Sequence, residues 1–119
     1  MDNFIEQAMA TESNITPHFT KPKVRLLHAA MGMSTEAGEF LDALKKSFFY
    51  NKPLDRVNLL EEIGDQLWYI AIALDELESD FSSEMDRVIR KLRTRFPEKF
   101  NELDAQLRDL DAEREELSR

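Results

Sequence analysis

Apolar residues recur at intervals of three and four along most of this chain, a spacing that predicts helices with one buried face. A short first helix is expected over residues 2–12, followed by a loop over residues 13–22 that contains two prolines. The longest helix is expected over residues 23–48 and the next over residues 56–78. The last of these carries a clean apolar stripe formed by Leu60, Ile63, Leu67, Ile70, Leu74 and Leu77.

The connections between these helices carry residues that stop or start a helix. Residues 50–55 interrupt the pattern, and Asp55 is the expected N-cap of the helix that follows. A second break at residues 79–80 precedes a fourth helix, which is expected to run from residue 82 or 83 to about residue 95. Pro97 then ends this helix or kinks the chain.

The last segment of the chain, residues 101–119, is highly charged and has a helical pattern. Its leucines have a spacing that resembles a coiled coil, and we expect them to pack on a partner subunit or on the same subunit: Leu103, Leu107, Leu110 and Leu117. Together the patterns predict an all-α protein that is a bundle of four or five helices. One domain is expected over residues 1–100, with residues 101–119 as a charged tail that packs in an oligomer.

Two pairs of acidic residues interrupt apolar rows on the two long helices. Glu36 and Glu39 project from adjacent turns of the first, and Glu62 and Asp65 repeat the pattern on the second. The rows are Met33, Glu36, Phe40 and Ala43 on the first helix, and Leu59, Glu62, Asp65, Tyr69 and Ile72 on the second. Because consecutive helices joined by a short connection pack antiparallel, we expect the two pairs to face each other.

Four carboxylates in one partly buried cluster repel each other and lose hydration, so a cation is expected to neutralise them. Oxygen ligands favour a hard divalent ion, with Mg²⁺ first and Mn²⁺ as a close substitute. Zinc is disfavoured because the chain has no cysteine and neither His18 nor His28 falls in the pattern. The alternative is that the acids pair with Lys45, Lys46 or basic residues of the fourth helix.

Charge and hydropathy exclude some classes of partner. The formal net charge of -8 disfavours nucleic-acid binding, which needs a basic surface. No apolar stretch is long enough to span a membrane, and the N-terminal residues lack the pattern of a signal peptide. A cytoplasmic protein that does not bind membranes is therefore expected.

Basic residues of the fourth helix are a local exception to the acidic balance. Lys91 and Arg95 are four residues apart and share a face suited to a triphosphate, with salt bridges to neighbouring helices as the alternative. Lys45 and Lys46 are further candidates for phosphate binding, or else they lie at a solvated helix end. Trp68 is expected to pack in the core, with stacking on a nucleotide base as the alternative.

The acidic motifs and their flanks resemble one known family. Glu36-Ala37-Gly38-Glu39 and Glu62-Ile63-Gly64-Asp65 are similar to the paired ExxE and ExxD motif of the MazG-like all-α nucleoside triphosphate pyrophosphohydrolases. The segments 33–42, 61–69 and 91–97 resemble three signatures of that family, and the likeness covers roughly residues 25–100. One departure is Val88, at a position where members often have an asparagine three residues before the signature lysine.

The resemblance implies hydrolysis of a nucleoside triphosphate to the monophosphate and pyrophosphate, with magnesium held by Glu36, Glu39, Glu62 and Asp65. It also implies a homodimer or a dimer of dimers with a metal site between two long antiparallel helices. A carboxylate not fully committed to the metal accepts the proton of the attacking water, and Glu36 and Glu39 are the candidates.

Three functional hypotheses follow. The first is general housecleaning of the nucleotide pool, and the second is a dedicated dUTP or phosphoribosyl-ATP pyrophosphohydrolase of the same superfamily. The third is a noncatalytic helical dimerisation or adaptor module, which the leucine spacing of the tail supports.

Overall fold

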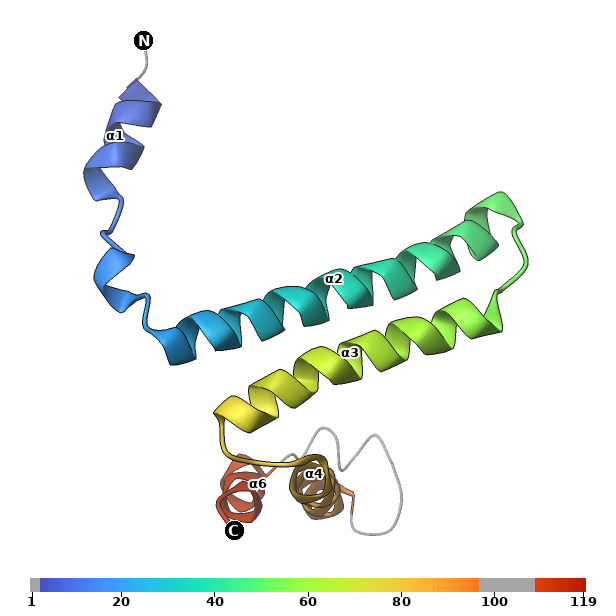
Figure 1. Cartoon of the computed structure of the whole chain (residues 1–119). Coiled ribbons are helices and arrows are strands. Elements are labelled where there is room, and N and C mark those ends of the chain that lie inside the picture. Colours follow the sequence, from blue (N-terminus) through green and yellow to red (C-terminus); the bar gives the residue numbers. More distant parts are fainter. Residues whose placement is uncertain (1–2, 97–108) are drawn as a thin grey trace. The chain divides into compact units, whose positions relative to one another are not determined.

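The computed structural model describes residues 3–96 and 109–119, and within them the regular structure is entirely helical (Figure 1). The elements are α1 (Asn3–Thr11), η1 (Thr16–His18), α2 (Lys21–Tyr50), α3 (Arg56–Glu76), α4 (Phe81–Arg95) and α6 (Leu110–Leu117). The prediction of an all-α protein is confirmed for the described residues. The chain divides into two compact units, Met1–Ala73 and Leu74–Arg119.

Helix α2 begins two residues earlier than the pattern predicts, at Lys21. The sequence placed Pro22 in the preceding loop, but proline is tolerated in the first turn of a helix, where its missing N–H has no partner to lose. The helix ends at Asn51, which adopts the left-handed conformation (φ 52°) and donates its N–H to the carbonyl of Lys46. Asparagine is one of the few residues that tolerates this cap.

Side-chain caps fix the starts of the next two helices. The Asp55 carboxylate accepts a hydrogen bond from the backbone N–H of Asn58 at 3.1 Å, so the predicted N-cap of α3 is confirmed. Asp80 does the same for α4, where it accepts from the N–H of Ser83 at 2.8 Å. Helix α4 therefore begins at Phe81, slightly earlier than expected, because Asp80 is the cap rather than the end of the break.

Helices α2 and α3 run antiparallel, side by side, as a hairpin in the first unit (Figure 1). Tyr69 of α3 lies against Gly32 of α2, where a β-carbon would come within 2.1 Å of the tyrosine ring. His28 packs edge-on to the same ring, with the ring centroids 5.7 Å apart. Ala29, next to this contact, is the one fully buried apolar side chain among the described residues.

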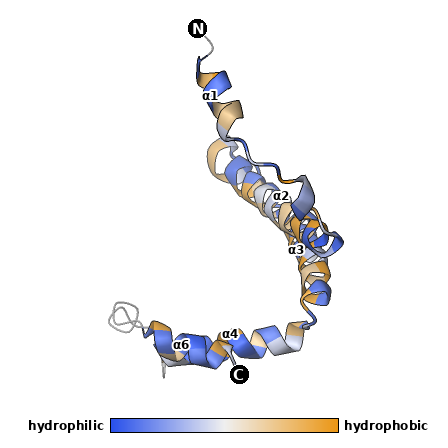
Figure 2. Ribbon diagram, turned by 90° about the vertical axis from the view of Figure 1, so that its left-hand side faces the viewer, coloured by the Kyte–Doolittle hydropathy of each residue, from blue (hydrophilic) through white to orange (hydrophobic). Residues whose placement is uncertain are grey.

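Much of the apolar stripe that the sequence predicts to be buried on α3 is exposed in the described chain, although Ile70 and Leu74 are half-buried. Leu60, Ile63 and Leu67 are each 43–48% exposed, because α3 turns its other row, the one that contains Glu62 and Tyr69, toward α2. A two-helix hairpin can cover only one row of each helix, and here the covered row is the acid-bearing one. Figure 2 shows the apolar positions, in orange, along α2 and α3.

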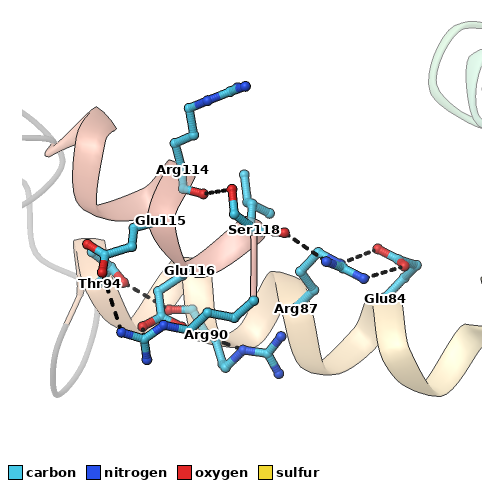
Figure 3. Close-up of polar contacts among 10 residues, drawn as sticks. Glu84, Arg87, Arg90, Thr94, Arg114, Glu115, Glu116 and Ser118 are labelled. Carbon is cyan, nitrogen blue, oxygen red and sulfur yellow. Dashed lines mark hydrogen bonds and ion pairs between the residues drawn. The ribbon is translucent and has the colours of Figure 1, made fainter.

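In the second unit, α6 lies beside α4, and the two helices are joined by charged contacts (Figure 3). Arg90 Nε lies 3.5 Å from a carboxylate oxygen of Glu116, and Arg87 donates to the carbonyl of Leu117 at 2.7 Å. The described part of the tail, residues 109–119, thus packs on its own chain, and it does so through charges rather than through Leu110 and Leu117, which are exposed. Leu103 and Leu107 of the predicted seam lie outside the described residues.

Among the described helices, none combines the length and the apolar character that a membrane-spanning segment requires.

Candidate metal centre

Three of the four motif acids meet between the helices of the hairpin. Glu36 lies on α2, one turn beyond Gly32, and Glu62 and Asp65 lie on α3. One carboxylate oxygen from each of the three acids lies within 4.8 Å of the others. The close contact of Tyr69 with Gly32 draws the two helices together one turn away, which helps to bring these carboxylates into one cluster.

The fourth acid, Glu39, lies one turn further along α2 and is exposed. It is outside the group of three, yet it interacts with Glu62 and lines a pocket with it. The structure therefore brings Glu36, Glu62 and Asp65 together and leaves Glu39 at the edge of the same cluster.

The cluster lacks the hydrogen-bond partners that buried carboxylates need. Glu62 is only 7% exposed, and one buried oxygen of Glu62 and one of Glu36 have no hydrogen-bond partner. The pKa of Glu62 is raised to about 7, first because its protonated form hydrogen-bonds to the Glu36 carboxylate, then because of burial and Glu39. Lys46, one of the alternative counter-ions, pairs instead with Asp42 at 2.9 Å.

These features fit a hard divalent cation. Such an ion takes oxygen ligands, and at about 2.1 Å per bond two ligands on opposite sides of Mg²⁺ lie about 4.2 Å apart. The 4.8 Å within which the three oxygens lie is slightly wider, so a small inward shift of the side chains would bring all three within bonding distance of one ion. Glu36, Glu62 and Asp65 are the residues that would hold the ion, with Glu39 beside them.

A pocket of about 320 Å³ opens on one side of the cluster, at the loop end of the hairpin. We call it the lysine pocket, and its lining includes Glu39, Asp42, Lys46, Lys52, Asp55, Asn58 and Glu62. Of the two neighbouring lysines that the sequence offered for phosphate, Lys46 lines it and Lys45 does not. The sequence analysis missed Lys52, whose position depends on the left-handed cap at Asn51, a feature that the asparagine itself signals.

A second pocket, of about 270 Å³, opens beside Glu36 and Asp65 and is completed by Trp68 and Tyr69. We call it the aromatic pocket. The expectation that Trp68 packs in the core is wrong for the described chain, because the indole is 59% exposed. Its neighbour Tyr69 takes the inward position against Gly32. The Trp68 ring lies edge-on to the Tyr69 ring, with the ring centroids 5.0 Å apart.

The two basic residues proposed for phosphate lie on α4, in the second unit. Arg95 Nε donates to Glu113 Oε1 at 2.9 Å, and its Nη2 reaches Glu113 Oε2 at 3.4 Å. The guanidinium is thus held by an acid of the neighbouring helix, which is the alternative that the sequence left open. Lys91 is half-buried on the same helix, and a phosphate-binding role for either residue stays a prediction.

Comparison with known proteins gives the family. The family model of the MazG nucleotide pyrophosphohydrolase domain matches residues 27–100, a range that contains the four motif acids and more than half of the chain. The searches of curated proteins and of solved structures found no match. This chain belongs to the MazG nucleotide pyrophosphohydrolase family.

Proposed function

We propose that this protein is a Mg²⁺-dependent hydrolase that converts nucleoside triphosphates to the monophosphate and pyrophosphate, and that it clears surplus or noncanonical nucleotides. Family membership implies nucleotide pyrophosphohydrolase activity in general. The observation that carries the proposal is the cluster of Glu36, Glu62 and Asp65, in which two buried carboxylate oxygens have no partner. An acid cluster left in this state is suited to a cation rather than to a structural role.

The residues divide the chemistry between them. A bound divalent ion would supply a water of lowered pKa and neutralise phosphoryl oxygens. Glu36, Glu62 and Asp65 hold the cation. Glu36 and Glu39 are the candidates to accept the proton of the attacking water, and Glu39 is favoured because it lies outside the group of three. The water oxygen bonds to one of the two phosphorus atoms of the α–β bridge, and the bond from that phosphorus to the bridging oxygen breaks. The proton of the water passes to the accepting carboxylate, and the monophosphate and pyrophosphate separate.

The nucleoside end of the substrate is assigned to the aromatic pocket. Trp68 exposes its indole beside Asp65, and every base offers a flat face to an aromatic ring. Lys91 and Arg95 are retained as further phosphate contacts. For Arg95 this requires phosphate to compete with Glu113.

We also propose that the protein acts as a homodimer or a dimer of dimers. The apolar stripe of Leu60, Ile63 and Leu67 is exposed within the described residues, and an apolar row at helical spacing suits a second copy of the same hairpin. Analytical ultracentrifugation tests this directly. Leu67→Glu should shift the wild-type oligomer toward the monomer, and a monomeric wild-type protein would contradict the proposal.

The direct test of the proposed reaction is pyrophosphate release from the common ribo- and deoxyribonucleoside triphosphates, dUTP and phosphoribosyl-ATP, with Mg²⁺. Glu39→Gln should lower the rate roughly a hundredfold or more, as expected for loss of a general base or a ligand. Glu61→Gln is the matched control, because Glu61 is an exposed acid next to Glu62 that belongs to neither pocket. Its rate should equal that of the wild type.

The pattern of substrates then separates the hypotheses. Release from several triphosphates supports housecleaning, and release from dUTP or phosphoribosyl-ATP alone would replace it with a dedicated enzyme. Silence across the panel, together with no effect of millimolar Mg²⁺ on thermal stability, would leave the noncatalytic adaptor.

A further inference from the structure

The lysine pocket and the aromatic pocket lie on different sides of the contact between Glu36 and Glu62. Each pocket is lined by two of the four motif acids. Glu39 and Glu62 line the lysine pocket, whereas Glu36 and Asp65 line the aromatic pocket. A ligand whose middle is bound at the acid cluster would therefore have one end in each pocket. The two ends differ in chemistry, so the ligand is expected to have a direction.

The backbone fixes where the two lysines of the lysine pocket lie. The left-handed cap at Asn51 turns the chain back over the last turn of α2, and the N–H of Lys52 reaches the carbonyl of Lys46 at 3.3 Å. The two lysines are thus carried by adjacent stretches of backbone and line one pocket.

The charges of the lysine pocket suit an anion only when a cation accompanies it. The lining holds two lysines and four acids, which gives it a formal excess of two negative charges when all are ionised. The acids are Glu39, Asp42, Asp55 and Glu62. Within the pocket, Lys46 pairs with Asp42, and the Asp55 carboxylate caps α3. A divalent ion at the acid cluster would offset part of the negative charge of Glu39 and Glu62. Lys52, and Lys46 once it parts from Asp42, would then offer positive charge to phosphate oxygens.

The aromatic pocket has no such groups. Among the described residues its lining consists of Glu36, Asp65, Trp68 and Tyr69, so these present carboxylates and ring faces and no cationic side chain. Terminal phosphates would be repelled there, whereas a base would find a surface on which to stack.

We propose that the nucleotide lies across the acid cluster in one direction, with its β- and γ-phosphates on Lys46 and Lys52 and its base on Trp68 and Tyr69. The lysine pocket is then the site that binds the pyrophosphate leaving group. This inference rests on the proposed function and deepens it, because it assigns an end of the substrate to each pocket.

Binding of the two products separately tests the assignment. Calorimetry would measure the Kd of inorganic pyrophosphate and of a nucleoside monophosphate, each with Mg²⁺, for wild type, Lys46→Met and Lys52→Met. Methionine keeps the length of the side chain and removes the charge. Each substitution should raise the Kd of pyrophosphate about tenfold or more and leave that of the monophosphate unchanged.

Two controls make the comparison specific. Lys45→Met removes a neighbouring lysine that does not line the pocket, and it should bind both products as wild type does. Trp68→Ala should show the reverse pattern, with weaker monophosphate binding and unchanged pyrophosphate binding. Unchanged melting temperatures would show that the variants are folded, as expected since the Lys46–Asp42 pair is exposed.

The outcomes separate the inference from the proposed function. If the wild type releases pyrophosphate from triphosphates but the lysine variants bind pyrophosphate normally, or lose the monophosphate instead, the direction is wrong and the function stands. If Lys45→Met weakens pyrophosphate binding equally, the effect comes from the general positive charge of the region, and the assignment is also overturned. If the wild type binds neither Mg²⁺ nor pyrophosphate and hydrolyses nothing, both fail together.

Discussion

Two glutamates are the buried charged residues of the described chain, and they have opposite surroundings. Glu62, 7% exposed, faces other carboxylates across the α2–α3 hairpin. Glu113, 3% exposed, is held by the guanidinium of Arg95 between α4 and α6. Both positions remove a carboxylate from water, but only the second provides a counter-charge. Burial of an acid alone therefore does not point to a functional site, whereas burial without a counter-charge makes an acid a candidate for one.

The pKa values of neighbouring groups follow the same division. In the second unit, a hydrogen bond from Ser79 and contacts with Arg87 hold the pKa of Glu84 below its usual value. In the hairpin, Glu36, burial and Glu39 raise the pKa of Glu62. Carboxylates of the second unit thus have basic partners, whereas Glu62 of the hairpin faces only other carboxylates.

The largest expected effect separates the two buried glutamates by activity. Glu62→Gln removes a cation ligand and should lower pyrophosphate release by about a hundredfold or more, since even supporting residues of metal sites cost ten- to a hundredfold. Glu113→Gln, assayed while folded, should keep at least the wild-type rate, since it only frees Arg95 from a competing carboxylate. Equal losses in the two variants would show that the difference in surroundings has no functional meaning.

Metal binding should distinguish the two regions by stability. Mg²⁺ at about a hundred times its Kd is expected to raise the free energy of unfolding by about 2.7 kcal/mol, because it binds only the folded cluster. Thermal or urea unfolding with Mg²⁺ and with a chelator measures this. The increase should vanish in Glu62→Gln and persist in Glu113→Gln.

Without metal, Glu113→Gln rather than Glu62→Gln should be the variant with the larger loss of stability. Glu113→Gln takes the counter-charge from the largely buried Arg95, and we expect a loss of about 2 kcal/mol in urea unfolding, below the value for a fully buried pair. Glu62→Gln removes a repulsive charge and should not destabilise the chelated protein. Glu115→Gln, at an exposed acid of the same helix, serves as the control and should change little.

Helix spacing and caps account for what could be predicted from the sequence. The intervals of three and four gave the helices, Asp55 gave the start of α3, and the spacing of Glu36 with Glu62 and Asp65 placed the acids on facing rows. These features depend on residues close together in the chain or on one helix face.

The remaining features depend on contacts between distant residues. Periodicity alone did not reveal that α3 turns Glu62 inward and the Leu60–Leu67 stripe outward, because both rows have helical spacing. Nor did it pair Arg95 with Glu113, eighteen residues away. Lys52 is a different case, because its position depends on the left-handed cap at the adjacent Asn51, which the sequence analysis did not consider.

The glycine beneath Tyr69 provides a smaller test of how the hairpin holds its acids. Gly32→Ala would place a methyl group inside the tyrosine ring, and we expect a cost of about 1–3 kcal/mol as the helices separate. Gly38→Ala is the matched control, because a β-carbon there meets nothing within 4 Å. It should stabilise α2 by up to about 1 kcal/mol, the ordinary helical preference for alanine. Equal behaviour of the two variants would contradict the packing of Tyr69 on Gly32.

The smallest expected effect is a pH dependence of the chelated protein. The folded pKa of Glu62, about 7, exceeds its ordinary value of 4.5, so the folded state binds more protons between these values. Stability should therefore fall as pH rises from about 4.5 to about 7, and Glu62→Gln should flatten this slope. The lowered pKa of Glu84 acts below that window. With Mg²⁺ the slope should reverse, because the ion needs the ionised carboxylates. A slope that survives in Glu62→Gln would assign the effect to other groups.

The exposure of Trp68 has a practical consequence for following the protein in solution. It is the one tryptophan of the chain, and it lines the aromatic pocket together with Asp65. Intrinsic tryptophan emission therefore arises from a single known place, and a base stacked on the indole should quench it. Occupancy of the nucleoside end can thus be read in real time, on the unlabelled wild-type protein.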